Sequence, residues 1–158
     1  MAEQYREILL NSPEETADFA ARFARVIAIG DTILLTGDIG AGKTHFSRHL
    51  IQNCLGCLED VPSPTFTLVQ TYDGPTCEIW HSDLYRLSSP EEVIELGLID
   101  AFETEICLVE WPDRLQELAP ANALSMSLKM TDETGQRQMM LAWTDPKWDS
   151  KLKDALSD

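Results

Sequence analysis

Basic residues are scarce in this chain. Its 158 residues include 12 lysines and arginines against 27 aspartates and glutamates, which gives a formal net charge of −15. Such an excess of negative charge repels phosphate backbones and argues against direct, charge-driven binding to DNA or RNA. We therefore expect any role in nucleic-acid metabolism to depend on a protein partner. An acidic chain of this kind is a reasonable match for a basic surface on such a partner.

Long hydrophobic runs are also missing. No stretch of about 18 apolar residues is present, and residues 1–6 do not combine a basic stretch with a following apolar one. We expect neither a membrane span nor a secretory signal. We therefore expect the protein to be located in the cytoplasm. The length fits one domain over residues 1–158 and leaves no room for a second.

Cysteine is sparse, with four residues in the chain. Cys54 and Cys57 have the C-x-x-C spacing of metal and redox sites, but no second pair completes a zinc set. A helix N-terminus lowers a thiol pKa, whereas this pair follows the end of a predicted helix, where the dipole acts in the opposite direction. Structural thiols are therefore favoured over a metal or redox role.

A phosphate-binding loop is the most informative feature that is present. Residues 37–44 read Gly-Asp-Ile-Gly-Ala-Gly-Lys-Thr, a full match to G-x-x-x-x-G-K-[ST]. Residues 32–36 before it are typical of a strand, and residues 43–54 of a helix. The glycines let successive N–H groups converge on phosphate oxygens, and the helix N-terminus adds favourable partial charge. The loop predicts a site for a nucleoside triphosphate.

Two side chains of the loop carry most of this chemistry. Lys43 supplies a cation for the β and γ phosphates, and the Thr44 hydroxyl is placed to hold Mg²⁺, which prefers oxygen ligands. The expected nucleotide-binding residues of this segment are Gly37, Asp38, Ile39, Gly40, Ala41, Gly42, Lys43, Thr44 and His45.

The order of apolar and turn residues predicts an α/β fold. Expected strands are 5–10, 32–36, 63–72, 77–81, 106–109, 124–130 and 138–143, and expected helices are 12–28, 43–54, 89–97 and 99–102. We predict a single P-loop NTPase-like domain whose mixed sheet has parallel core strands, antiparallel hairpins and helices on both faces. Residues from about 147 to 158 are expected to form a loose, charged C-terminal helix.

Two tetrapeptides have the composition of helix starts. Ser12-Pro13-Glu14-Glu15 and Ser89-Pro90-Glu91-Glu92 each provide an N-cap serine, a proline at the first helical position and a capping-box glutamate. We expect the first helix to run to about Ala28, before Gly30, and the second to end at Gly97.

An acidic residue follows the continuous apolar run Ile106–Val109. Such a run suits a strand buried on both faces. In P-loop proteins the acid that ends a neighbouring strand orders the magnesium shell or positions the attacking water. Glu110 is a candidate for either role, and the alternative is an exposed acid at a strand end.

A polar cluster, His81-Ser82-Asp83-Leu84-Tyr85-Arg86, lies at the end of another predicted strand. Loops beyond strand ends often carry functional sites. The residues alone leave two interpretations open: a polar network that caps the strand, or a catalytic or switch cluster. A metal site built on the single histidine is less favoured.

Four motifs, taken in order, resemble the bacterial TsaE family, also called YjeE. They are Gly37-Asp-Ile-Gly-Ala-Gly-Lys-Thr44, Ser63-Pro-Thr-Phe66, His81-Ser-Asp-Leu-Tyr-Arg86 and Val109-Glu-Trp-Pro112. Many unrelated enzymes share the first motif, whereas the other three are specific to this family. The resemblance covers nearly the whole chain.

The resemblance implies an ATPase that uses ATP, ADP and Mg²⁺ and is required for tRNA modification. The modification is the threonylcarbamoylation of the adenosine beside the anticodon in tRNAs that read codons beginning with A. A TsaE-like protein docks on the TsaD–TsaB complex, which transfers the group, and hydrolyses ATP to reset that complex. Contact with tRNA is then indirect, through the partners.

The resemblance also implies roles for individual residues. Lys43 and Thr44 would hold the phosphates and magnesium, and Glu110 would complete the metal shell. Asp83 would act in hydrolysis or its control, and Thr65 would sense the γ-phosphate in a switch-like loop. The expected catalytic residues are thus Lys43, Thr65, Asp83 and Glu110, and the expected metal ligands are Thr44 and Glu110.

The base contacts and the source of a catalytic arginine are less defined. Asn11, after the first strand, and Arg137, at the start of the last, are candidates for adenine contacts, although either could be an exposed loop residue. Arg86 and Arg114 are the nearest candidates for an internal arginine finger. With so few arginines, we expect low activity alone and stimulation by the partner.

Three other functions are compatible with a P-loop. A small-molecule or nucleotide kinase would need an arginine-rich lid, and no such insertion is present. A non-catalytic docking module would bind nucleotide without turning it over. A guanine-nucleotide switch would need an Asn-Lys-x-Asp or Thr-Lys-x-Asp segment, which the chain lacks.

Overall fold

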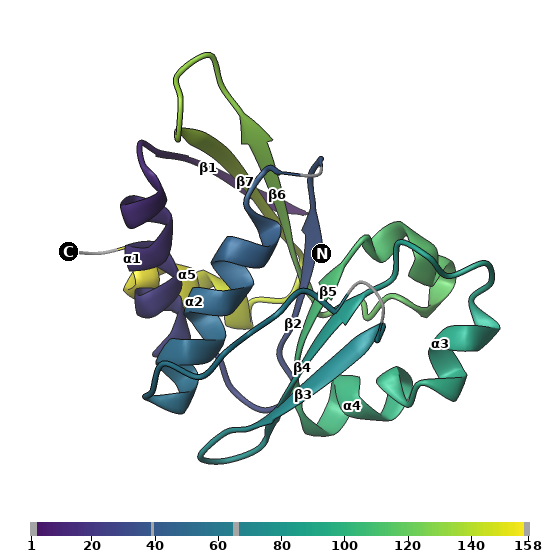
Figure 1. Cartoon of the computed structure of the whole chain (residues 1–158). Coiled ribbons are helices and arrows are strands. Elements are labelled where there is room, and N and C mark those ends of the chain that lie inside the picture. The colour runs from purple at the N-terminus through teal and green to yellow at the C-terminus, as the bar shows by residue number, and fades with distance from the viewer. Residues whose placement is uncertain (1–2, 39, 65–66, 157–158) are drawn as a thin grey trace.

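The predicted strands assemble into one mixed sheet. The computed structural model describes residues 3–38, 40–64 and 67–156, in which a seven-stranded sheet has the order β1-β7-β6-β2-β5-β4-β3 (Figure 1). The strands are β1 Gln4–Leu10, β2 Thr32–Thr36, β3 Val69–Asp73, β4 Glu78–Asp83, β5 Ile106–Glu110, β6 Leu124–Met130 and β7 Arg137–Trp143. The four strands β6-β2-β5-β4 run parallel, and the pairs β1–β7, β6–β7 and β3–β4 are antiparallel. The expected parallel core with antiparallel hairpins is confirmed.

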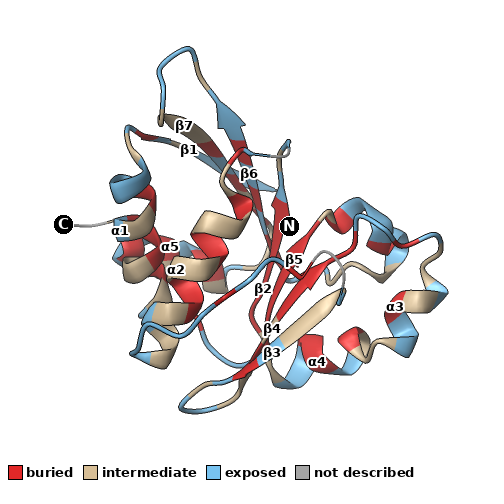
Figure 2. Ribbon diagram, viewed as in Figure 1, coloured by how far each residue is buried: buried red, intermediate tan, exposed pale blue. Residues whose placement is uncertain are grey.

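Helices cover both faces of this sheet, as predicted (Figure 1). α1 Pro13–Ala24, α2 Lys43–Leu55 and α5 Lys147–Leu156 lie on one face, and α3 Glu91–Glu95 and α4 Leu98–Thr104 lie on the other. Successive strand residues point to opposite faces, so Leu35 joins the core under α1, α2 and α5, whereas Leu34 joins the core beside α3 and α4. The buried residues concentrate in the central strands (Figure 2).

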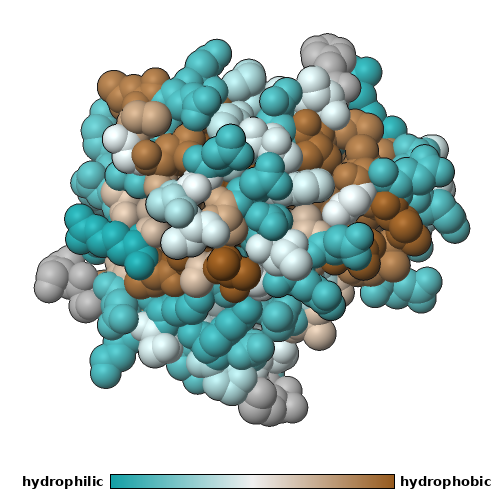
Figure 3. Space-filling view, turned by 90° about the horizontal axis from the view of Figure 1, so that it is seen from below, coloured by the Kyte–Doolittle hydropathy of each residue, from teal (hydrophilic) through white to brown (hydrophobic). Residues whose placement is uncertain are grey.

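Large exposed apolar side chains are dispersed over the chain, at Leu58 and Ile94 among other positions. On the end of the molecule that faces down in Figure 1, hydrophobic side chains form separate groups among hydrophilic ones (Figure 3). Isolated apolar side chains at the surface are normal for a folded protein. Of the helices in the described residues, none combines the length and apolar character needed to cross a membrane.

α1 begins as the sequence predicts. The Ser12 Oγ accepts a hydrogen bond of 3.1 Å from the Glu15 N–H, while the Glu15 carboxylate accepts from the Asn11 N–H at 3.0 Å. The helix ends at Ala24 rather than near Ala28. The Asp31 carboxylate accepts the Ala28 N–H at 2.8 Å, which turns the chain into β2.

Two further predicted boundaries are wrong. α3 has Pro90 at its N-cap with no side-chain cap, and it is Ser88, not Ser89, that bonds the Glu92 carboxylate, at 2.6 Å. The strand predicted over 63–72 begins only at Val69. The Leu68 N–H donates to the Pro64 carbonyl at 2.7 Å, and Leu68 has a positive φ of 69°, so the chain turns before the strand starts.

The C-terminal helix α5 is firmly packed rather than loose. Trp148 is 0% exposed, its ring stacks on Phe23 with centroids 6.0 Å apart, and its Nε1 donates to the Asn122 carbonyl at 2.8 Å. Lys147 and Lys151 both form ion pairs with the buried Asp31. The helix therefore closes the core formed by α1 and β2.

We expect Trp148→Ala to lower the free energy of unfolding by about 3–5 kcal/mol, because truncation of a buried tryptophan loses contacts and leaves a cavity. Urea denaturation followed by circular dichroism measures this change. Ser150→Ala, at an exposed position of the same helix, serves as the control. An equal, small change in both variants would mean that α5 contributes little to the core.

Candidate nucleotide site

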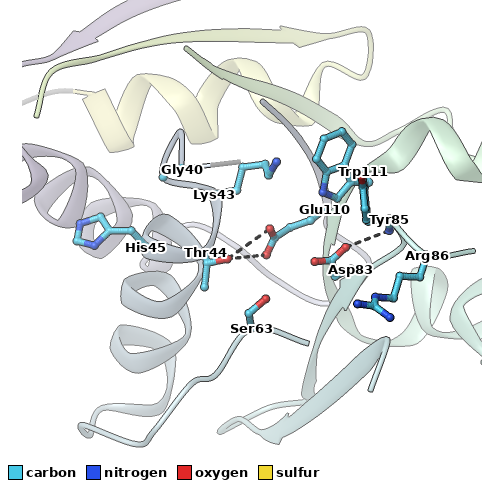
Figure 4. A pocket seen from close by; sticks show the side chains of 11 residues that line it. Gly40, Lys43, Thr44, His45, Ser63, Asp83, Tyr85, Arg86, Glu110 and Trp111 are labelled. Carbon is cyan, nitrogen blue, oxygen red and sulfur yellow. Dashed lines mark hydrogen bonds between the residues drawn. The ribbon is translucent and has the colours of Figure 1, made fainter. Parts of the chain in front are cut away.

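The candidate site lies where the carboxyl ends of the parallel strands meet. In the sheet register Glu110 of β5 lies opposite both Leu35 of β2 and Asp83 of β4. A cavity of about 420 Å³ opens there. Its lining consists of Gly40, Gly42, Lys43, Thr44, His45, Ser63, Asp83, Tyr85, Arg86, Glu110 and Trp111 (Figure 4). The structure thus brings residues of all four sequence motifs into one pocket.

The loop between β2 and α2 has the backbone that its glycines predict. Gly37 has φ 145°, and a Cβ atom there would lie 2.5 Å from the Leu128 carbonyl oxygen. Gly42 has φ 105° at the N-cap of α2. A side chain at either position would strain the loop. Ile39 lies outside the described residues.

Lys43 is the buried cation of the pocket. Its Nζ donates to the Gly37 carbonyl and lies 4.1 Å from the centroid of the Trp111 ring. Burial lowers the pKa of Lys43, and the nearby carboxylates of Glu110, Asp83 and Asp38 act in the opposite direction. A phosphate entering the pocket would likewise favour the charged ammonium.

Thr44 and Glu110 form an oxygen-donor pair. The Thr44 hydroxyl lies 3.5 Å from each oxygen of the Glu110 carboxylate, and the two side chains point toward each other (Figure 4). Glu110 is only 2% exposed, so the interpretation as an exposed strand-end acid is wrong. A buried carboxylate beside a hydroxyl at the start of the loop helix suits Mg²⁺, a hard cation.

His81 is the contact that sequence reasoning missed. Its Nε2 lies 2.7 Å from Glu110 Oε2, and its side chain is fully buried. The signal was available only indirectly, because strand alternation places His81, Asp83 and Glu110 on one face once β4 and β5 are known to be neighbours. Among the described residues no group of three or more histidines, cysteines and acids could hold a metal.

The remaining pocket residues surround Asp83. Asp83 Oδ1 accepts a hydrogen bond of 3.0 Å from the Tyr85 N–H, and the Tyr85 ring packs against Trp111 with centroids 4.9 Å apart. Of the two arginine-finger candidates, Arg86 lines the cavity and Arg114 does not. Ser63 also lines it, whereas Thr65 and Phe66 of the same motif lie outside the described residues.

Of the two adenine candidates, Arg137 contacts the loop of residues 37–44, and Asn11 contacts the neighbour of Arg137 in sequence. The Arg137 guanidinium donates to the Ala41 carbonyl at 2.9 Å and to the Gly40 carbonyl at 3.2 Å. Asn11 accepts a hydrogen bond from Gln136, the neighbour of Arg137, at 2.8 Å. Arg137 therefore bonds directly to the phosphate-binding loop. Asn11 does so only indirectly, through Gln136 in the β6–β7 hairpin.

The cysteines have the environment of structural thiols. Burial, with a smaller effect of Cys77, raises the pKa of Cys54 to about 11, and burial raises that of Cys107 to about 12. Thiols with such values stay protonated at neutral pH and are poor nucleophiles and metal ligands. Cys57, the other half of the C-x-x-C pair, is exposed.

Comparison with known proteins agrees with this geometry. Residues 10–139 match the model of the family described as threonylcarbamoyl adenosine biosynthesis protein TsaE. The chain is 43% identical over 127 residues to tRNA threonylcarbamoyladenosine biosynthesis protein TsaE of Rickettsia bellii, covering 80% of this chain and 88% of that protein. It is 37% identical over 119 residues to the protein of the same name from Bacillus subtilis, covering 75% and 73%.

A solved structure extends the comparison to the fold. The crystal structure of Bacillus subtilis YdiB is similar with a TM-score of 0.81 at 27% sequence identity, covering 98% of this chain and 96% of the other. The matched segment contains the loop of residues 37–44 together with Asp83 and Glu110. The chain therefore belongs to the TsaE family of P-loop ATPases involved in tRNA modification.

Proposed function

We propose that this protein binds and hydrolyses ATP in the cytoplasm, in support of tRNA threonylcarbamoylation. Its partner is the TsaD–TsaB complex, which ATP hydrolysis resets, and tRNA is reached only through that complex. The observation that carries this proposal is the convergence of Lys43, Thr44, Asp83 and Glu110 on one cavity. Each of these side chains has a defined part in phosphoryl transfer to water.

The phosphates would be held by the loop and its lysine. Lys43 would exchange the Gly37 carbonyl for β- and γ-phosphate oxygens, and the N–H groups of the loop would bind the same oxygens. Thr44 and Glu110 would hold Mg²⁺, which neutralises charge on the phosphates when it is bound. We assign Asp83, beside Glu110 in the sheet, to hydrolysis or its control.

Two further assignments complete the proposed site. Ser63 lines the cavity, and Thr65, two residues later in the sequence, stays our candidate for the γ-phosphate sensor. Arg137 and Asn11 stay the candidates for the adenine side, and the bonds of Arg137 to the loop support its proximity to a bound nucleotide.

We expect Lys43→Ala to weaken ATP binding by about tenfold or more, because it removes charge-assisted hydrogen bonds to the phosphates. Isothermal titration calorimetry measures the change. Lys129→Ala, at an exposed position of β6, is the charge-matched control, and circular dichroism checks the fold. Unchanged ATP affinity in a folded Lys43→Ala protein would remove the lysine from the site.

Glu110→Gln should still bind ATP, with a smaller contribution from Mg²⁺, and lower turnover by roughly 10²–10⁴-fold, because it removes the charge that serves the metal shell or the attacking water. The rate of phosphate release at saturating ATP measures this effect. Glu117→Gln, at an exposed position after β5, is the control. Normal hydrolysis in Glu110→Gln would assign Glu110 a purely structural role.

Phosphate release from ATP should be slow with the protein alone and faster when a purified TsaD–TsaB pair is added, with no stimulation in Lys43→Ala. The physical reason is the short supply of arginine in the pocket, where Arg86 is the sole arginine among the lining residues. Tight ATP binding without turnover beside the pair would instead favour a docking module. Phosphate found on an acceptor molecule would favour a kinase.

A further inference from the structure

The buried pair His81–Glu110 joins the motifs of residues 81–86 and 109–112. The proposed function gives Glu110 a role but leaves His81 without one. His81 is 0% exposed and its Nε2 lies 2.7 Å from Glu110 Oε2. Its backbone lies opposite Leu108 in the β4–β5 register, two positions before Asp83. The imidazole therefore approaches the carboxylate from within the core, whereas Thr44 approaches it from α2.

Packing alone does not account for a histidine at this position. The neighbours on the same face of the sheet, Ile79 and Leu108, belong to the apolar core. The second ring nitrogen of His81, Nδ1, has no hydrogen-bond partner among the described residues. A buried polar atom without a partner costs about 1–3 kcal/mol, a cost that an aliphatic side chain would avoid.

The contact with Glu110 explains what the histidine contributes. Among the described residues the Glu110 carboxylate contacts the Thr44 hydroxyl at 3.5 Å through both oxygens, and His81 at 2.7 Å through Oε2 alone. The short bond thus determines the orientation of the carboxylate. The other carboxylate oxygen, Oε1, has only the 3.5 Å contact with the Thr44 hydroxyl.

We infer that His81 is a positioning residue that orients the Glu110 carboxylate toward Mg²⁺ bound with the nucleotide. This inference rests on the proposed function, which supplies the metal and the nucleotide. Carboxylates that bind metals are commonly held by hydrogen bonds from a second residue, and loss of that residue weakens metal binding about 10–100-fold. His81 acts through Glu110 and contacts neither phosphate nor water in this role.

The test measures how much Mg²⁺ strengthens the binding of the non-hydrolysable analogue AMPPNP. Its dissociation constant is determined by calorimetry with saturating Mg²⁺ and with EDTA, and the ratio of the two is the readout. His81→Leu should lower this ratio by about tenfold, with the affinity in EDTA unchanged. Ser82→Ala is the matched control, because Ser82 is equally buried on the same strand but faces the opposite side of the sheet.

Two polar variants keep the test decisive if His81→Leu does not fold. The amide nitrogen of glutamine can occupy the place of Nε2, so His81→Gln should retain most of the Mg²⁺ effect. The amide of asparagine corresponds to Nδ1, so His81→Asn should lose the effect as leucine does. Equal ratios in the glutamine and asparagine variants would overturn the inference.

A double-mutant cycle separates action through Glu110 from a general effect on the fold. In a Glu110→Gln background, His81→Leu should cause no further loss of the Mg²⁺ effect, whereas additive losses would overturn the inference. A wild-type protein that binds AMPPNP without any Mg²⁺ effect would overturn the proposed function as well. A wild-type Mg²⁺ effect that His81→Leu leaves intact would overturn the positioning role alone.

Discussion

The arrangement of the site depends on the burial of one carboxylate between parallel strands. Glu110 ends β5, which is flanked by β2 and β4 and covered on both faces, and a charge in such a place is costly unless other groups compensate it. Lys43 supplies a nearby positive charge, while Thr44 and His81 supply hydrogen-bonding groups. The first turn of α2, which follows the loop after β2, and the end of β4 therefore both contribute side chains that surround the Glu110 carboxylate.

The charge balance of the pocket favours a ligand that brings its own cation. Lys43 faces the carboxylates of Asp38, Asp83 and Glu110, which all act on its pKa. The positive charges of Lys43 and Arg86, the lysine and the arginine among the described lining residues, cannot neutralise these three carboxylates and a triphosphate together, and the chain as a whole carries −15. Coulomb repulsion in a partly buried site is large compared with thermal energy. Under the proposed function, ATP bound with Mg²⁺ would electrostatically be a better ligand for this pocket than ATP alone.

Local patterns predicted the elements of the site well, and long-range contacts account for what they missed. The strand before the loop, the helix after it and the buried run ending at Glu110 each follow from residues adjacent in sequence. The partnership of His81 with Glu110 depends instead on the register of two parallel strands, which no local pattern specifies. The packing of α5 also depends on a long-range contact. Its charged sequence suggested a loose tail, but Trp148 stacks on Phe23 of α1, which is far away in the sequence. The strand predicted from residue 63 begins only at Val69, because the Leu68 N–H binds the Pro64 carbonyl and Leu68 has a positive φ.

Backbone hydrogen bonds connect Leu68, the residue before β3, to the ends of β4 and β5. The carbonyl of Leu68 accepts the Asp83 N–H at 2.9 Å, and the Leu84 N–H donates to the Glu110 carbonyl at 3.1 Å. The backbone thus links Leu68 to β4 and then to β5, across the strand that carries both His81 and Asp83. These bonds join the end of β5, at the candidate site, to the start of β3, the strand at the edge of the sheet.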